Sequence, residues 1–240
     1  MKEKIIVYDL ETNGLSPAMD RILEVYLLVY NCKKNKIEKE YHNYVQILTN
    51  NVEVYVHMQT GWTAQFLNEM GVPMLQMIAE VNNITTVEAP EALIVGYNIR
   101  RFDNQFLYKY EKRYDLDSPN YQFRSFDVYL EFKAVLAGLY DTKAKREDWR
   151  TAHGMVLKND YSTFIKENKG MGSLNMEACC RYYGVKVDNK KQHHAKYDSI
   201  LALEVLKKQR PEWFEKEGQG HKGGTGTSNV PVPKKAVLTT

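Results

Sequence analysis

The chain contains 240 residues, of which 43% are hydrophobic and 26% are charged. These fractions are ordinary for a globular domain and exclude a wholly disordered chain. The 33 basic and 30 acidic residues give a net charge of +3, which is too small for a non-specific nucleic-acid coat. No stretch approaches the ~18 apolar residues of a membrane span, and the apolar run near the start is too short for a signal peptide. The sequence therefore predicts no membrane association and a cytoplasmic location.

The cysteine content argues against disulfide or structural zinc chemistry. Cys32, Cys179 and Cys180 are an odd number and too few for a disulfide framework. Adjacent cysteines rarely pair with each other, and the chain has no Cys-x-x-Cys spacing. We expect all three thiols to be reduced and buried.

Short apolar runs separated by turn residues predict strands, and apolar residues at helical spacing predict helices. The predicted strands cover residues 4–10, 22–30, 37–48 and 93–97. The predicted helices cover residues 73–81, 102–110, 128–140, 174–183 and 195–209. Three consecutive strands followed by mixed strands and helices indicate an α/β fold with a mixed β-sheet flanked by helices.

Two segments depart from this pattern. Residues 141–171 are polar and weakly patterned, and we interpret them as an insertion or a mobile flap. The chain beyond residue 217 is rich in Gly, Ser, Thr, Pro and Lys, a composition typical of disorder. The sequence therefore predicts one folded domain over residues 1–216 and a disordered tail over 217–240.

A pair of carboxylates, Asp9 and Glu11, closes the first predicted strand. Side chains at i and i+2 of a strand point to the same face, so the two acids repel each other unless a cation lies between them. An α/β sheet usually forms its site at such a strand end, and hard divalent ions prefer carboxylate oxygens. A solvated strand end with two ordinary acids is the alternative interpretation.

Two further acids lie near the starts of predicted helices. Asp103 follows the strand that ends at Tyr97, in a position where the helix dipole alone would favour an acid. Asp198 lies on the clearest predicted helix, and His193 precedes it by five residues. Taken singly, His193 could be a helix cap and Asp198 could be an exposed helix acid.

Together, these residues and their flanks resemble the DEDD superfamily of 3′–5′ exonucleases, which have a ribonuclease H-like fold. Asp-x-Glu-Thr-x-Gly-Leu over residues 9–15 matches the first motif, and Gly-Tyr-Asn followed by Phe-Asp matches the second, around Asn98 and Asp103. His-x-Ala-x-x-Asp over residues 193–198 matches the third motif, and its histidine is typical of the DEDDh branch. The second motif looks most like those of exonuclease I and replicase proofreading domains.

The resemblance implies two divalent metal ions, Mg²⁺ or Mn²⁺, that stabilise the attacking and leaving oxygens of a phosphodiester. Asp9, Glu11 and Asp198 would hold the first ion. Asp9 and, largely through water, Asp103 would hold the second. Without metal, four such carboxylates should repel one another and have raised pKa values.

The resemblance also implies a general base and a substrate site. His193 would deprotonate the attacking water, and the adjacent His194 is the rival candidate that the five-residue spacing disfavours. Trp62 lies in a loop similar to the family's Gly-Ile-Thr loop, where its indole could stack on a base or pack on the core. The remaining residues expected to contact substrate belong to the first two motifs: Thr12, Asn13, Gly14, Leu15, Tyr97 and Asn98.

The sequence thus predicts a metal-dependent 3′–5′ exonuclease that releases nucleoside monophosphates from single-stranded or frayed DNA. The alternative substrate is RNA, which an exoribonuclease of the same branch would degrade. The site of such an enzyme must accept the 2′-hydroxyl of the sugar. A protein of the same fold that binds nucleic acid without catalysis is the alternative to an enzyme. The tail could recruit a polymerase or another protein partner. The basic residues Lys143, Lys145, Arg146 and Arg150 either follow a phosphate backbone or form a solvated surface.

Overall fold

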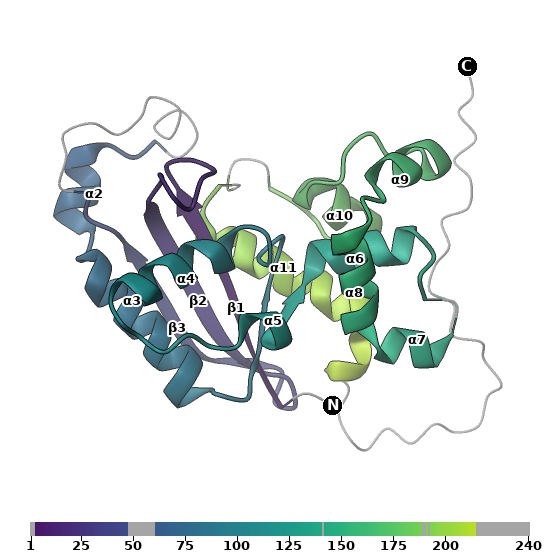
Figure 1. The fold of residues 1–240 in the computed structure, drawn as a ribbon, viewed down its shortest axis with the longest axis horizontal. Helices are drawn as coiled ribbons and strands as arrows, with labels where there is room; N and C mark the ends of the chain where they lie inside the picture. The colour runs from purple at the N-terminus through teal and green to yellow at the C-terminus, as the bar shows by residue number, and fades with distance from the viewer. Residues whose placement is uncertain (1–2, 48–60, 141, 189–190, 192, 215–240) are drawn as a thin grey trace.

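The computed structural model describes residues 3–47, 61–140, 142–188, 191 and 193–214. A five-stranded sheet carries helices against both of its faces (Figure 1). The strands are β1 (Lys4–Thr12), β2 (Ile22–Asn31), β3 (Lys36–Tyr44), β4 (Leu93–Gly96) and β5 (Ser125–Asp127). In the sheet order β3-β2-β1-β4-β5, β2 is antiparallel to β1 and β3, whereas β1, β4 and β5 are parallel. The predicted α/β fold with a mixed sheet is confirmed.

Alternation along the central strand β1 divides the core into two layers. Ile5 and Val7 pack in one layer and Ile6 and Tyr8 in the other, and all four are fully buried. The first layer contains α6 (Val128–Leu136), α10 (Met176–Tyr183) and α11 (Ala195–Gln209), and the second contains α3 (Met74–Asn83) and α4 (Asp103–Arg113). The other helical elements described are α2 (Ala64–Met70), η1 (Ile84–Glu88), α5 (Tyr121–Arg124), α7 (Lys143–Glu147), α8 (Trp149–Lys158), α9 (Ser162–Lys169) and η2 (Pro211–Trp213).

The predicted strands and helices are all present, with boundaries that differ by a few residues. The helix predicted over 128–140 ends at Leu136, because Gly138 adopts φ +71° just beyond it and turns the chain away. The strand predicted over 37–48 ends at Tyr44, and residue 48 lies outside the described residues. The pattern does not predict α2 or β5, which have seven and three residues and are too short to show a clear period.

The described residues of the segment 141–171 are largely helical and pack on the rest of the domain. They form α7, α8 and α9, and both α8 and α9 pack against α6. Trp149, Val156 and Ile165 are buried there. Helices of five, ten and eight residues contribute few buried side chains each, which hides their apolar period in the sequence. That the segment is an insertion or a mobile flap stays a prediction.

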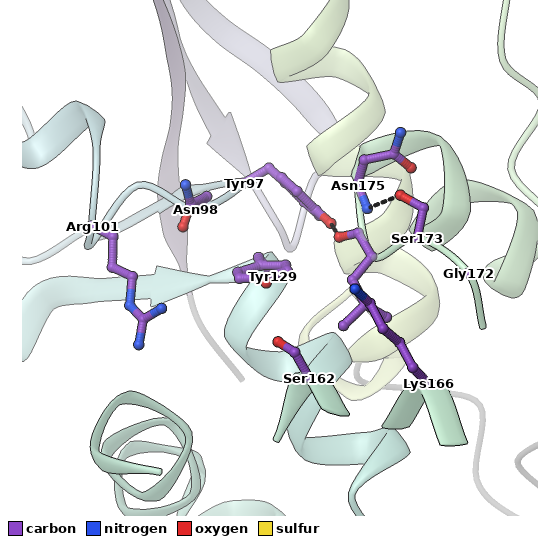
Figure 2. Close-up of a pocket in the computed structure, with 10 residues that line it drawn as sticks. Tyr97, Asn98, Arg101, Tyr129, Ser162, Lys166, Gly172, Ser173 and Asn175 are labelled. Atoms are coloured by element: carbon purple, nitrogen blue, oxygen red, sulfur yellow. Dashed lines mark hydrogen bonds between the residues drawn. The ribbon is translucent and has the colours of Figure 1, made fainter. Parts of the chain in front are cut away.

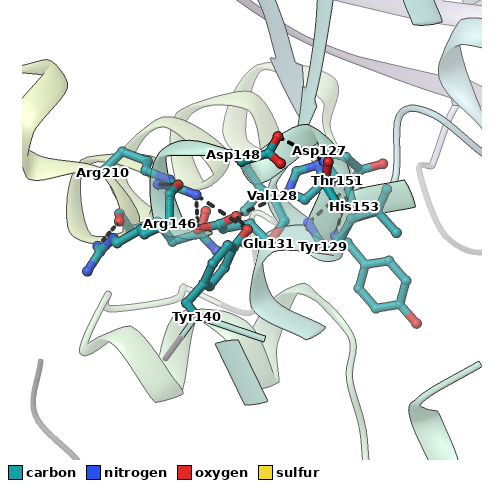
Figure 3. A network of polar contacts seen from close by, with 12 residues as sticks. Asp127, Val128, Tyr129, Glu131, Tyr140, Arg146, Asp148, Thr151, His153 and Arg210 are labelled. Carbon is teal, nitrogen blue, oxygen red and sulfur yellow. Dashed lines mark hydrogen bonds and ion pairs between the residues drawn. The ribbon is translucent and has the colours of Figure 1, made fainter. Parts of the chain in front are cut away.

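A buried polar network fixes this segment to the rest of the domain (Figure 3). The carboxylate of Glu131 on α6 pairs with Arg210 at 2.7 Å and His153 on α8 at 3.1 Å, and it accepts the hydroxyl of Tyr140 at 2.5 Å. Although burial alone would raise the pKa of Glu131, His153 and Arg210 hold it below its usual value. Because three partners compensate this buried charge, the network ties α6, α8 and the end of α11 together.

Two residues of the basic run contribute to the fold. Arg146 Nη2 donates to the carbonyl of Gln209 at 2.5 Å, and Arg150 Nε donates to the carbonyl of Phe123 at 3.2 Å. These contacts favour a structural role for both guanidinium groups over an extended phosphate-binding track.

The remaining sequence predictions concern the cysteines, membrane association and the tail. Cys32, Cys179 and Cys180 are free and buried, as predicted. In the part of the chain that the structure describes, no helix has the length and apolar character required to cross a bilayer. The predicted disordered tail over residues 217–240 lies outside the described residues.

Candidate active site

The carboxyl ends of β1 and β4 meet at one edge of the sheet. Val7 on β1 is paired in parallel with Val95 on β4, so Asp9 lies at the level of Tyr97, the residue just beyond β4. Asp9 and Glu11 follow Val7 at intervals of two residues and therefore share its face of the strand, toward α11. The register thus places both acids of the first motif at this edge.

A sharp turn after β4 builds the second motif. A Cβ on Gly96 would lie only 2.7 Å from the carbonyl oxygen of Tyr8, so glycine permits the close approach of β4 to β1. Asn98 adopts φ +61°, a left-handed conformation that favours asparagine among the non-glycine residues. The buried carboxylate of Asp127 then accepts the backbone N–H groups of Asn98 at 2.9 Å and Arg100 at 3.0 Å. The turn is therefore held by the end of β5.

This turn places Asp103 next to Asp9 and Glu11. Asp103 is the first residue of α4, and its side chain is only 2% exposed. Its Oδ1 accepts the backbone N–H of Leu10 at 3.0 Å. Because Leu10 lies between the two acids of β1, this bond brings the third carboxylate next to them.

The start of α11 positions the fourth acid, Asp198, and the histidine, His193. Asp198 lies in the first turn of α11, and its Oδ2 accepts the backbone N–H of His193 at 3.2 Å. The buried carboxylate of Glu24 on β2 accepts the backbone N–H of Ala195 at 2.9 Å through one oxygen. Its other oxygen lies 2.6 Å from Nε2 of His42 on β3. The first turn of α11 is thus anchored to the sheet.

The four acids form an electrostatically repulsive cluster. Glu11, Asp198 and His193 each bring one ligand atom to within 4.8 Å of the others. Burial, followed by repulsion from Asp103, raises the pKa of Asp9 well above its usual value. Burial and the charge of Asp198 raise the pKa of Glu11 to about 8. Burial also raises the pKa of Asp103 to about 7 and that of Asp198 to about 6. Such a cluster holds protons or cations.

The two candidate bases occupy different environments. His193 is exposed, adopts φ +63° and lies with the carboxylates. His194 precedes α11 in an extended conformation, and its ring centroid lies 5.8 Å from that of Trp62. The geometry therefore brings His193, and not the ring of His194, into the described metal-ligand group.

The loop after β1 is held by local hydrogen bonds and exposes one apolar side chain to solvent. Thr12 Oγ1 donates to the carbonyl of Gly14 at 2.6 Å, and Asn13 bonds through its side chain to the residue before β2. A Cβ on Gly14 would lie 2.3 Å from the carboxylate of Asp20, which packs against this glycine. Leu15 is 85% exposed. The loop therefore presents backbone groups and an exposed leucine near the acidic cluster.

Trp62 packs on the core. Its side chain is 6% exposed and lies among Leu23, Ile47 and Leu67. The ring of Tyr44 contacts its indole edge-on, with centroids 5.2 Å apart. Of the two interpretations from sequence, this geometry fits core packing, since the indole has little free face for a base.

Tyr97 and Asn98 line a cavity of about 640 Å³ (Figure 2). The hydroxyl of Tyr97 donates to the carbonyl of Leu174 at 2.5 Å, and its ring centroid lies 5.3 Å from that of Tyr129. These two residues of the second motif thus face a cavity whose other walls come from α6, α9 and the segment before α10.

Sequence reasoning missed Glu24 and Asp127, which position the motif residues. Glu24 had a detectable signal, because it is an acid within the otherwise apolar run 22–30. A buried acid in such a run requires a partner, here the start of α11. Asp127 had a weaker signal, because it ends a strand of only three residues.

Comparison with known proteins agrees with this architecture. A structure of exonuclease I is 20% identical with a TM-score of 0.64 and covers 89% of this chain and 42% of that chain. The structure of E. coli exonuclease I in complex with a dT13 oligonucleotide is 20% identical with a TM-score of 0.63, over 89% of this chain and 43% of that one. The zinc-bound form of the E. coli exonuclease I–single-stranded DNA complex is 19% identical with a TM-score of 0.62, over 89% and 42%. No match is found among curated proteins.

The mixed sheet, the flanking helices and the acids at its edge define the ribonuclease H-like exonuclease fold, as in exonuclease I. The sequence model of the RNase T exonuclease family matches residues 6–206, and the chain belongs to this family. The prediction of a 3′–5′ exonuclease of the DEDD superfamily is therefore confirmed at the level of family and fold. The chain spans about 42% of the exonuclease I chain it matches.

Proposed function

We propose that this chain is a metal-dependent 3′–5′ exonuclease that releases nucleoside monophosphates from single-stranded or frayed DNA. The observation that carries the proposal is the convergence of four carboxylates and an exposed histidine from three separate parts of the chain. The family match and the single-stranded DNA bound to exonuclease I support this class of substrate.

The donor set of the acidic cluster fits two divalent metal ions, Mg²⁺ or Mn²⁺. Hard cations prefer carboxylate oxygens, and the raised pKa values reflect burial together with mutual repulsion that a cation would relieve. Asp9, Glu11 and Asp198 would hold one ion, and Asp9 and Asp103 would hold the other. When bound, such ions stabilise the attacking and leaving oxygens of a phosphodiester and help to ionise water.

His193 would accept the proton of the attacking water. Its exposure lets substrate and water reach the imidazole, while its backbone N–H bond to Asp198 keeps the ring beside the acids. A positioned side chain that moves this proton supplies general base catalysis. Because the ring of His194 packs against Trp62, His193 is the better candidate.

The terminal nucleotide would bind against the loop after β1. Thr12, Asn13 and Gly14 offer backbone and side-chain polar groups to a sugar, and the exposed Leu15 offers an apolar surface to a base. Trp62 would border this site through its ring contact with His194, the residue before α11. A cytoplasmic location and a protein partner for residues 217–240 stay predictions of the sequence.

A gel assay on 5′-labelled single-stranded DNA, duplex DNA and RNA tests the proposal, with Mg²⁺, Mn²⁺ or EDTA. We expect a metal-dependent ladder that shortens single-stranded DNA from its 3′ end and is lost in Asp9→Ala and His193→Ala. Faster shortening of RNA would replace the DNA assignment by the exoribonuclease alternative. Binding of single-stranded DNA without degradation in either metal would favour the non-catalytic module and contradict the proposal.

A further inference from the structure

The cavity that Tyr97 and Asn98 line extends beyond the known motifs. It has a volume of about 640 Å³, within the range of pockets that hold small ligands. Figure 2 shows its walls, which come from the turn after β4, from α6, from α9 and from the segment before α10. The lining includes Tyr97, Asn98, Arg101, Tyr129, Ser162 and Lys166.

The charges of this cavity suit an anion. Arg101 and Lys166 are exposed cations that lie toward opposite sides of the cavity in Figure 2, and Arg101 also donates to the carbonyl of Leu157 at 3.3 Å. No carboxylate belongs to its described lining. The neighbouring acid, Asp160, is paired with Lys133 at 2.9 Å. The lining therefore offers two positive charges without a competing negative one.

The walls of the cavity are preformed. The hydroxyl of Tyr97 is bonded to the carbonyl of Leu174, which fixes one ring. Lys133 lies 5.2 Å from the ring centroid of Tyr129 and donates to Ser162 Oγ at 2.8 Å, which fixes the other ring and the start of α9. A site that combines aromatic rings with cations is the chemistry by which proteins bind the bases and phosphates of single-stranded nucleic acid.

The sheet order relates the cavity to the acidic cluster. Tyr97 lies at the level of Asp9 on the neighbouring parallel strand, and such strands are ~4.8 Å apart. β4 and the loop that connects β1 to β2 lie on opposite sides of β1. A strand whose terminal nucleotide contacts the loop at Thr12 would therefore pass the acids and continue over β4 into the cavity.

We propose that this cavity binds the nucleotides on the 5′ side of the scissile bond, with phosphates on Arg101 and Lys166 and a base against Tyr129. The inference rests on the proposed exonuclease function and deepens it. It assigns α9, in the segment 141–171, a part in holding the substrate strand.

The test compares substrates that do and do not reach the cavity. The 4-nitrophenyl ester of thymidine 5′-monophosphate carries nitrophenol in place of the upstream nucleotide, so it occupies only the acidic site and the terminal-nucleotide site. An oligothymidylate of about eight nucleotides would fill the cavity as well. Hydrolysis of both substrates with Mn²⁺ is measured for the wild type and for the double variant Arg101→Gln/Lys166→Gln. Both positions are exposed, so the variant should fold.

We expect the double variant to hydrolyse the nitrophenyl ester at the wild-type rate. Its KM for the oligonucleotide should rise about tenfold with little change in kcat. The slope of log KM against log salt concentration should decrease by about 1.4, which corresponds to two lost phosphate contacts. The matched control is Lys169→Gln, which removes a charge from the same helix outside the described cavity lining and should change KM less than about twofold.

Several results would overturn the inference. One is an unchanged KM of the double variant for the oligonucleotide, and another is an equal rise in the Lys169→Gln control. Parallel loss of nitrophenyl ester hydrolysis would assign the cavity to the terminal nucleotide instead. If the wild type hydrolyses neither substrate, the proposed function fails. Anisotropy of labelled oligothymidylate in EDTA then still decides whether the two cations bind the strand.

Discussion

Replacing Glu11 with Gln should stabilise the metal-free protein while removing a proposed metal ligand. The folded carboxyl has a pKa of about 8 against an ordinary value of 4.5. The folded state therefore keeps a proton that the unfolded state releases, and stability is full below about pH 4.5 and declines as the pH rises through 8. At pH 7 the cost has an upper limit of about 3 kcal/mol, from about 1.4 kcal/mol for each pH unit above 4.5.

An amide of the same shape carries no such cost, because it does not ionise. The gain in Tm for a domain of this size is about 2–4 °C per kcal/mol, so the upper limit of about 3 kcal/mol corresponds to a rise in Tm of about 6–12 °C for Glu11→Gln at pH 7. Neighbouring carboxyls share the bound protons, so the measured gain should lie below this limit. The gain should shrink toward pH 5, where the wild-type carboxyl is protonated in the folded state.

Thermal unfolding followed by circular dichroism between pH 5 and 8 in EDTA measures this effect. The matched control is Glu167→Gln on α9, an exposed position where the substitution should change the Tm little at any pH. Mn²⁺ should raise the Tm of the wild type more than that of Glu11→Gln, because the variant lacks a ligand. An equal or lower Tm of Glu11→Gln at pH 7.5 in EDTA, or a gain of the same size at pH 5, would refute the reasoning.

Three further predictions concern catalysis and the fold. His193→Ala should lower kcat on single-stranded DNA by about 10²–10⁴, whereas His194→Ala should keep kcat within a few-fold of the wild type; equal losses would contradict the assignment of the base. Arg210→Leu should cost about 3–5 kcal/mol in urea unfolding, because it strips the buried Glu131 of a charge partner. Gly96→Ala should lower stability by about 1–3 kcal/mol, because its Cβ would meet a backbone carbonyl of β1, and a wild-type urea midpoint would disprove that contact.

The catalytic candidates are predicted from sequence because each lies in a short motif that resembles those of the DEDD exonucleases. Asp9 and Glu11 alternate on β1, and His193 precedes Asp198 by five residues. Such short-range spacing can be recognised in the sequence alone. The structure adds the long-range contacts that join these pieces, such as the bond from the Leu10 N–H to Asp103 across 93 residues.

Other parts of the molecule depend on contacts that no local pattern encodes. Glu24 is separated from its partner Ala195 by 171 residues, so the sequence reveals only that an acid interrupts an apolar run. The position of Trp62 was ambiguous because an indole suits both a core and a base-stacking site. The packing of the segment 141–171 is hidden in the sequence because its contacts reach distant elements, such as that of His153 Nε2 with Glu131 on α6 at 3.1 Å.

We propose that the acids around Asp9, together with His193, remove nucleotides from a 3′ end. The most direct measurement uses single-stranded DNA labelled only in its 3′-terminal nucleotide, with Mn²⁺, and identifies the first labelled product by chromatography. We expect this product to be a deoxynucleoside 5′-monophosphate, released by the wild type and not by Asp9→Ala. A first labelled product longer than one nucleotide, or release that persists in EDTA, would contradict it.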